Sequence, residues 1–282
     1  MAKKSWAKFP YEQKPFDYPG DKLAKAWGKL HAGDCEPWPD EARAAALLAA
    51  AGKAGKPADA ARLAAALQQA WRDYHRGDFQ AAFEAGEALG PLGASVAVKA
   101  GGIHAIHLLD EDARPARFEQ LASLAEAAAK ALPKEANAHF RRAFAIGRYS
   151  QGISVAKALS MGLAGKVKES LDRTLALEPR HAEAHTALGL YHAEIINKVG
   201  AMIGGLTYGA KAAVGEKHLK TALELTPDSP IAHIEYANGL LLLHGERKED
   251  EAATAFEKAG NLKPRDAMEK LDVEFARAQL ED

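Results

Sequence analysis

Three segments in the second half of the chain repeat one pattern of leucine, alanine and proline. Ser170 to Pro179 reads SLDRTLALEP, and Lys217 to Pro227 reads KHLKTALELTP, which is the same pattern displaced by 48 residues. A weaker copy, AFEKAGNLKP, runs from Ala255 to Pro264. Repetition at such a period is typical of a stack of similar supersecondary units rather than of one irregular core.

The residues that follow these prolines repeat as well. His139, His185 and His233 each lie six residues after a proline. Because a proline cannot continue a helix without the loss of a backbone hydrogen bond, each proline predicts the end of one helix and a turn into the next. A single helix pair cannot bury its apolar face alone. We therefore expect an all-α chain, built as an α-solenoid of antiparallel helix pairs.

The alanine content agrees with this interpretation. Alanine supplies 62 of the 282 residues, and it is the residue that forms helices most readily. A small residue, Ala143, Gly189 or Ala237, occurs at the same place in three successive units, where neighbouring helices are expected to cross.

The chain is expected to have three parts. Residues 1–40 are rich in aromatic residues and proline, and they predict an extended arm that is anchored by its aromatic side chains and has one short helix over residues 21–30. Residues 41–93 predict N-terminal helices over residues 41–51, 57–75 and 78–89. Residues 94–282 predict the repeat array with a C-terminal capping helix. The arm either covers an exposed end of the helical body or occupies a groove.

Three stretches resemble the tetratricopeptide-repeat family. GDFQAAFEAGEAL at residues 77–89 is similar to its loop and second helix, AEAHTALGLY at 182–191 to its first helix, and TALELTP at 221–227 to its closing turn. Two units depart from the family length of about 34 residues. The additional residues fall within helix pairs, at 147–165 and 193–215, and Arg142 stands where the family has an apolar residue.

A narrower resemblance covers residues 138–233. A long insertion, a K-x-x-(x)-L-x-x-A/T-L-x-L-x-P segment and an Ala-His dipeptide occur there together. This combination resembles the tetratricopeptide domain of the regulator-of-microtubule-dynamics family and its bacterial relatives. The resemblance implies a non-catalytic interaction module, with a hydrophobic groove linked to lipid binding in some members. It does not imply a role at microtubules for this chain.

The charge and cysteine content of the chain indicate which partners it is expected not to bind and where in the cell it is expected to be. The chain has 37 basic and 38 acidic residues and no long basic stripe, so we expect no nucleic-acid binding. Cys35 is its single cysteine, which excludes an intramolecular disulfide. The N-terminal residues do not form an apolar signal core, and the uncharged run between Lys198 and Lys211 is too short to span a bilayer. The sequence predicts a cytoplasmic protein with no transmembrane segment.

Histidine pairs are the only pattern that points to a metal. His181 and His185 are four residues apart, and His104 and His107 are three apart, spacings that can place two imidazoles on one helix face. No HExxH motif accompanies them, so we predict no metal. His139, His185 and His233 are better explained as a repeat position with one ring nitrogen bonded to backbone or solvent; a ladder of these three rings is the alternative.

No other motif indicates chemistry. The GLAGKVKES segment at residues 162–170 lacks the spacing and the hydroxyl residue of a phosphate-binding loop. A nucleophile motif with a neighbouring base is absent as well. The sequence therefore predicts no cofactor, no catalytic residues and a protein that is not an enzyme.

The first functional hypothesis is a scaffold that binds a protein or peptide on the concave face of the array. Its expected lining, one set per unit, combines apolar side chains with polar groups that orient a ligand. The lining residues are Asn137, Phe140, Phe144, Arg148, Glu183, Thr186, Leu190, Ile234, Asn238 and Leu241.

The alternative hypothesis is a carrier of an apolar ligand, such as a lipid acyl chain, held beneath the glycine-rich insertions. It requires a closed apolar cavity covered by a flap that contains Met161, Met202, Ile203 and Leu206. Contact of the flap around Met202, Ile203 and Leu206 with a membrane surface is the other interpretation of these residues. A metal-dependent enzyme is a third and weaker hypothesis. The sequence identifies neither the partner nor the oligomeric state.

Overall fold

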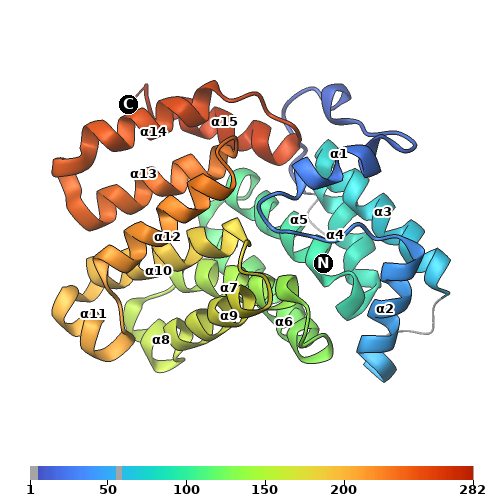
Figure 1. Cartoon of the computed structure of the whole chain (residues 1–282), viewed down its shortest axis with the longest axis horizontal. Coiled ribbons are helices and arrows are strands. Elements are labelled where there is room, and N and C mark those ends of the chain that lie inside the picture. Colours follow the sequence, from blue (N-terminus) through green and yellow to red (C-terminus); the bar gives the residue numbers. More distant parts are fainter. Residues whose placement is uncertain (1–5, 55–58, 282) are drawn as a thin grey trace. The chain divides into compact units, whose positions relative to one another are not determined.

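The computed structural model describes residues 6–54 and 59–281, and those residues form helices, turns and loops without any strand (Figure 1). The expected all-α class is therefore confirmed. The helix that the sequence predicts from Pro57 begins at Ala60, and Pro57 itself lies outside the described residues.

The chain divides into two compact units. Unit 1 comprises residues 1–27 and 36–170, and unit 2 comprises residues 28–35 and 171–282, so the boundaries expected at residues 40 and 93 both fall within unit 1. The helices of unit 1 are α1 (Lys22–Leu30), α2 (Glu41–Ala51), α3 (Ala60–Arg76), α4 (Phe79–Ala88), α5 (Ala94–Leu108), α6 (Arg114–Ala131), α7 (Ala136–Gln151) and α8 (Val155–Ser160).

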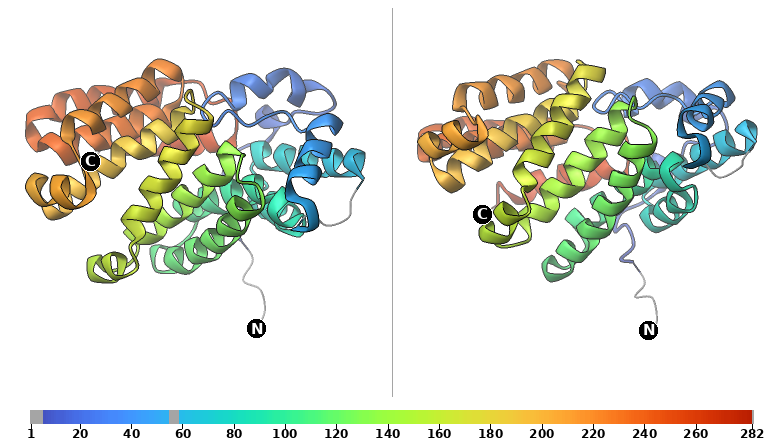
Figure 2. Two further views of the ribbon diagram at one scale, coloured as in Figure 1. Left: turned by 60° about the horizontal axis from the view of Figure 1, so that its bottom comes forward. Right: turned by 90° about the horizontal axis from the view of Figure 1, so that it is seen from below.

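Two helices contribute residues to both units, namely α1 and α9 (Leu163–Leu177). The remaining helices belong to unit 2 and run alongside one another in both views of Figure 2, coloured yellow to red. They are α10 (Ala182–Val199), α11 (Ala201–Tyr208), α12 (Ala212–Leu225), α13 (Pro230–His244), α14 (Glu249–Asn261) and α15 (Ala267–Ala278).

Helix ends follow local signals in the sequence. The Asp40 carboxylate accepts a hydrogen bond of 2.7 Å from the Arg43 backbone N–H and so caps the start of α2. Asp266 caps α15 in the same way, through the Glu269 N–H at 2.9 Å. Gly77 ends α3 with a left-handed φ of 96°, a conformation that side-chain-bearing residues rarely adopt.

From α2 to α7 in unit 1, and from α12 to α15 in unit 2, each helix packs against the next one in the sequence. In unit 1 a core cluster joins residues of α2, α3, α5 and α6, and in unit 2 another joins α12, α13, α14 and α15. Gly189 shows why small residues recur at crossings: a Cβ atom there would lie 2.6 Å from Leu219 Cγ. Ala143 and Ala237 are likewise buried. The expected crossing positions are thus confirmed as closely packed sites.

The two insertions predicted from the sequence each contain a short additional helix. Helix α8 lies between α7 and α9, and α11 lies between α10 and α12. Among the described residues, no helix has both the length and the apolar character needed to cross a bilayer.

Candidate functional site

An extended segment of the chain itself is bound to the helices of unit 1. Residues 6–20, drawn in dark blue in Figure 1, contain little helix, and they contact residues of α3 and α4. Phe9 and Phe16 are buried, at 8% and 5% exposed, so aromatic side chains anchor this segment as the sequence predicts. We refer to residues 6–20 as the N-terminal segment.

Trp6 marks one end of the contact. Its ring centroid lies 5.2 Å from that of Phe83 on α4 and 4.4 Å from that of His104 on α5. The guanidinium carbon of Arg117 on α6 lies 4.0 Å from the centre of the same indole. Trp6 therefore meets an apolar ring, an imidazole and a cation, an arrangement in which cation–π attraction adds to apolar burial. We call Phe83, His104 and Arg117 the Trp6 pocket.

The polar groups of the Trp6 pocket are held in a desolvated environment. His104 is only 1% exposed, and burial, together with the charge of Arg117, lowers its pKa to about 4. The backbone of Ala7 acts in the opposite direction but more weakly. Burial also lowers the pKa of Arg117, whose Nη1 atom is buried without a hydrogen-bond acceptor. The imidazole is therefore neutral at pH 7 and the guanidinium is the pocket's cation.

Phe9 occupies a second position, at the end of α3. Its ring contacts Gly77 so closely that a Cβ atom there would lie 2.8 Å from Phe9 Cγ. The ring also packs edge-on against Phe79, with 6.4 Å between centroids. The absence of a side chain at Gly77 thus permits both the left-handed turn and the close approach of the N-terminal segment.

Hydrogen bonds fix the remainder of the N-terminal segment. Gln13 donates from Nε2 to the Asp78 carboxylate at 2.8 Å. Arg72 on α3 donates to two backbone carbonyls, those of Tyr18 at 3.0 Å and Gly20 at 3.2 Å. Unit 1 therefore binds both the side chains and the main chain of an extended peptide.

The expected concave-face residues of unit 1 form internal contacts. Asn137 and Phe140 are buried, and Asn137 donates to Glu36 Oε2 at 2.8 Å. Phe144 packs against Phe118 with 6.0 Å between ring centroids, and Arg148 donates to Gln151 at 3.2 Å.

The expected residues of unit 2 are also mostly internal. Ile234 and Thr186 are buried, and Leu190 packs beside the core cluster that contains Ile234. The backbone N–H of Glu183 donates to Gly33 O at 2.9 Å, and Asn238 donates to Glu235 at 2.9 Å. Only Leu241, at 38%, is an exposed large apolar residue of the expected lining.

The flap residues are exposed to solvent. Met161 is 39% exposed, Met202 76%, Ile203 52% and Leu206 85%. Side chains exposed to this extent do not form the wall of a closed cavity, which the carrier hypothesis requires.

The repeated histidines contact the turn that precedes their helix. The ring Nε2 of His139 lies 3.0 Å from the carbonyl oxygen of Pro133. The corresponding distance is 3.0 Å between His185 and Pro179, and 2.8 Å between His233 and Pro227. The expected backbone bond is confirmed. The nearest imidazole partner of His185 is His218 on α12, with 2.8 Å between Nδ1 atoms.

Metal ligands do not gather in the part of the chain that the structure describes: no group of three or more His, Cys, Asp or Glu residues there could hold a metal ion. His181 is the N-cap of α10, where its Nδ1 accepts from the Ala184 N–H at 3.0 Å.

Comparisons with known proteins add no homologue. No family model matches the chain, and no curated protein matches it. The resemblance to tetratricopeptide-repeat proteins therefore stays a prediction from the sequence.

The sequence did not indicate the Trp6 pocket. Phe83, His104 and Arg117 lie on three different helices, and neither the tetratricopeptide-like stretch that contains Phe83 nor the His104–His107 pair indicated that they meet. The excess of aromatic residues in the first 40 positions was the signal that the N-terminal segment had a binding role.

Proposed function

We propose that the chain is a non-catalytic, tetratricopeptide-like α-solenoid of antiparallel helix pairs that binds an extended protein or peptide segment. One observation carries this proposal: the helices of unit 1 bind residues 6–20 of the same chain as an extended peptide. The N-terminal segment acts as an internal ligand that a partner peptide replaces.

The chemistry of the contact supports peptide recognition. Trp6 and Phe9 supply two aromatic anchors, and tryptophan paired with arginine is typical of the residues that dominate binding energy at interfaces. Arg72 binds backbone carbonyls, which every peptide has, so specificity rests on the anchors. The preferred partner is an extended segment with two aromatic residues three positions apart.

A competition experiment tests the proposal. A fluorescently labelled peptide of residues 6–20 is added to the full chain and to its Trp6→Ala/Phe9→Ala variant. In the natural chain the tethered segment competes at a high effective concentration, of roughly millimolar order. We expect the peptide to bind the variant at least tenfold more tightly than the natural chain.

Two controls make the result specific. A peptide in which both aromatic residues are alanine is expected not to bind, and a chain with Leu241→Ser, a change at an exposed site of unit 2, is expected to behave like the natural chain. Equal affinity for the variant and the natural chain, with both folded by circular dichroism, contradicts the proposal.

A further inference from the structure

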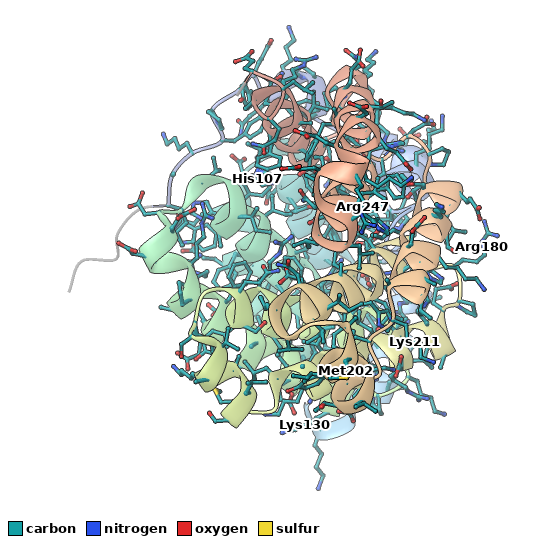
Figure 3. All side chains as sticks on the ribbon, turned by 90° about the vertical axis from the view of Figure 1, so that its left-hand side faces the viewer. His107, Lys130, Arg180, Met202, Lys211 and Arg247 are labelled. Atoms are coloured by element: carbon teal, nitrogen blue, oxygen red, sulfur yellow. The ribbon has the colours of Figure 1, made fainter. Side chains whose placement is uncertain are left out.

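Helix α11 has an inverted distribution of side chains. Its glycine face lies toward α10: Gly204 is buried, and a Cβ atom there would lie 3.2 Å from Ile195 Cγ2. Its large apolar residues Met202, Ile203 and Leu206 are exposed at 76%, 52% and 85%. In Figure 3, Met202 lies on the side of α11 that faces the viewer. A helix that serves only the core has the opposite arrangement.

The chain segment from residue 195 to residue 215, which includes α11, carries charges of one sign. Residues 195–215 contain no aspartate or glutamate, and their charged residues are Lys198 and Lys211. Lys198 pairs with Glu194 at 2.7 Å, whereas Lys211, the N-cap residue of α12, is exposed (Figure 3). An apolar surface thus lies next to a cation in a segment free of acidic side chains.

Helix α8, in unit 1, has the same character. Its Val155 and Leu159 are 50% and 46% exposed, and Met161 directly after it is 39% exposed. Residues 136–168 contain no acidic residue, although acidic residues number 38 in the whole chain. The basic residues on and beside α8 are Arg148, Lys157, Lys166 and Lys168.

We propose that α11 binds the surface of an anionic lipid membrane, and that α8, whose apolar side chains are less exposed, adds a weaker contact of the same kind. The exposed apolar side chains enter the boundary between headgroups and acyl chains, while the flanking lysines contact anionic headgroups. A membrane is favoured over a protein partner because lysine is depleted at the core of protein interfaces, whereas lysine beside an uncharged apolar helix suits an anionic interface. Neither helix spans the bilayer.

Vesicle co-sedimentation tests this surface in the full chain. The probes are vesicles of phosphatidylcholine alone and vesicles in which one third of the lipid is phosphatidylserine. We expect sedimentation with the anionic vesicles, weaker binding as salt is raised, and at least a fivefold loss of bound protein for Met202→Ser/Ile203→Ser/Leu206→Ser. All three positions are exposed, so the variant is expected to keep its fold.

The matched control also changes exposed apolar residues of unit 2, but away from α11. Leu241→Ser/Phe275→Ser/Leu280→Ser removes side chains that are 38%, 42% and 46% exposed, and it is expected to bind vesicles like the natural chain. Lys211→Glu is expected to weaken binding to the anionic vesicles and to leave binding to the neutral vesicles unchanged.

Three results overturn the proposal: no binding to either vesicle, equal binding to neutral and anionic vesicles, or equal losses for the two triple variants. Self-association of the natural chain without lipid, abolished by the α11 variant, assigns this face to a second copy and also overturns it. The peptide competition described above uses no lipid and does not involve α11, so the two proposals fail separately.

Discussion

The Nε2 atom of His185 lies 3.0 Å from the carbonyl oxygen of Pro179, six residues earlier in the chain. Because a carbonyl oxygen only accepts, the imidazole of His185 donates from Nε2. Its Nδ1 lies 2.8 Å from Nδ1 of His218, so one of these two nitrogens donates to the other. The histidine thereby joins the turn before α10 to its first helical turn and to α12.

The first prediction concerns the same bond in the other repeats. His233 is 5% exposed, whereas His139 makes its bond in a more exposed setting. Replacement of the histidine by alanine leaves the proline carbonyl oxygen without its hydrogen-bond donor. Water can replace this donor only where the carbonyl is accessible to solvent. We expect His233→Ala to lower the free energy of unfolding by about 1–3 kcal/mol and His139→Ala by less than about 1 kcal/mol. Urea denaturation measures both, and equal losses contradict this account.

The second prediction separates backbone strain from the contact with Phe9. Gly77 and Gly20 both have positive φ, of 96° and 60°, but only Gly77 has a close neighbour, whereas nothing lies within 4 Å of a Cβ atom at Gly20. We expect Gly20→Ala to cost roughly 1–2 kcal/mol from strain alone. Gly77→Ala should cost more and should displace Phe9.

Nuclear magnetic resonance spectra of the N-terminal segment give the second readout for this pair. Chemical-shift changes that reach Trp6 and Phe9 are expected in Gly77→Ala, whereas those in Gly20→Ala are expected to stay close to residue 20. Addition of Phe9→Ala to Gly77→Ala should cause little further loss of stability, because the alanine at position 77 has already displaced Phe9 from its contact.

The third prediction follows from the pKa of His104. Burial and Arg117 lower this pKa from an ordinary value of 6.5 to about 4 in the folded state. The unfolded chain therefore binds a proton at His104 more readily than the folded chain does. The free energy of unfolding is undiminished by this effect above pH 6.5, and it decreases as the pH falls toward 4. The full effect is at most about 3 kcal/mol.

A His104→Gln variant isolates that effect. Urea denaturation between pH 7 and pH 4.5 is expected to show a smaller decline in stability for the variant than for the natural chain. His218 also has its pKa lowered to about 4, by burial and by its histidine neighbours, and it contributes to both curves. Parallel curves for the two proteins count against the assignment.

The fourth prediction concerns Cys35. Burial, with a smaller contribution from the Glu178 and Asp34 carboxylates, raises the pKa of its thiol to about 11. Since the thiolate is the reactive form, alkylation by iodoacetamide at pH 8 is expected to be roughly 100-fold slower in the folded chain than in denaturant. Mass spectrometry of timed samples measures the rates, and similar rates in both conditions refute the prediction.

The sequence predicted the helices closely wherever local signals were strong. Helix α2 occupies the predicted residues 41–51, because Asp40 caps its start and Gly52 follows its end. Helices α9, α12 and α14 end shortly before Pro179, Pro227 and Pro264, as the repeat pattern required. These features depend on backbone hydrogen bonding within a few residues, which a single sequence specifies.

The sequence could not determine which apolar side chains are buried and which are exposed. Phe140 and Ile234 share the spacing expected of a ligand-binding face, yet both are buried, whereas Leu206, in an apolar glycine-rich run, is 85% exposed. Helical periodicity identifies a face but not its neighbour. That choice depends on how closely another helix approaches, as at Gly204 and Ile195.

By itself, then, the sequence determined an all-helical chain, the places where its helices begin and end, and the repeated histidine bonded to its proline turn. Tertiary structure alone decided that Trp6 meets His104 and Arg117, residues about a hundred positions away, and that α11 directs its large apolar side chains outward. Local order follows from hydrogen bonds between near neighbours in the chain. Sites follow from contacts between distant segments, which only the packed fold brings together.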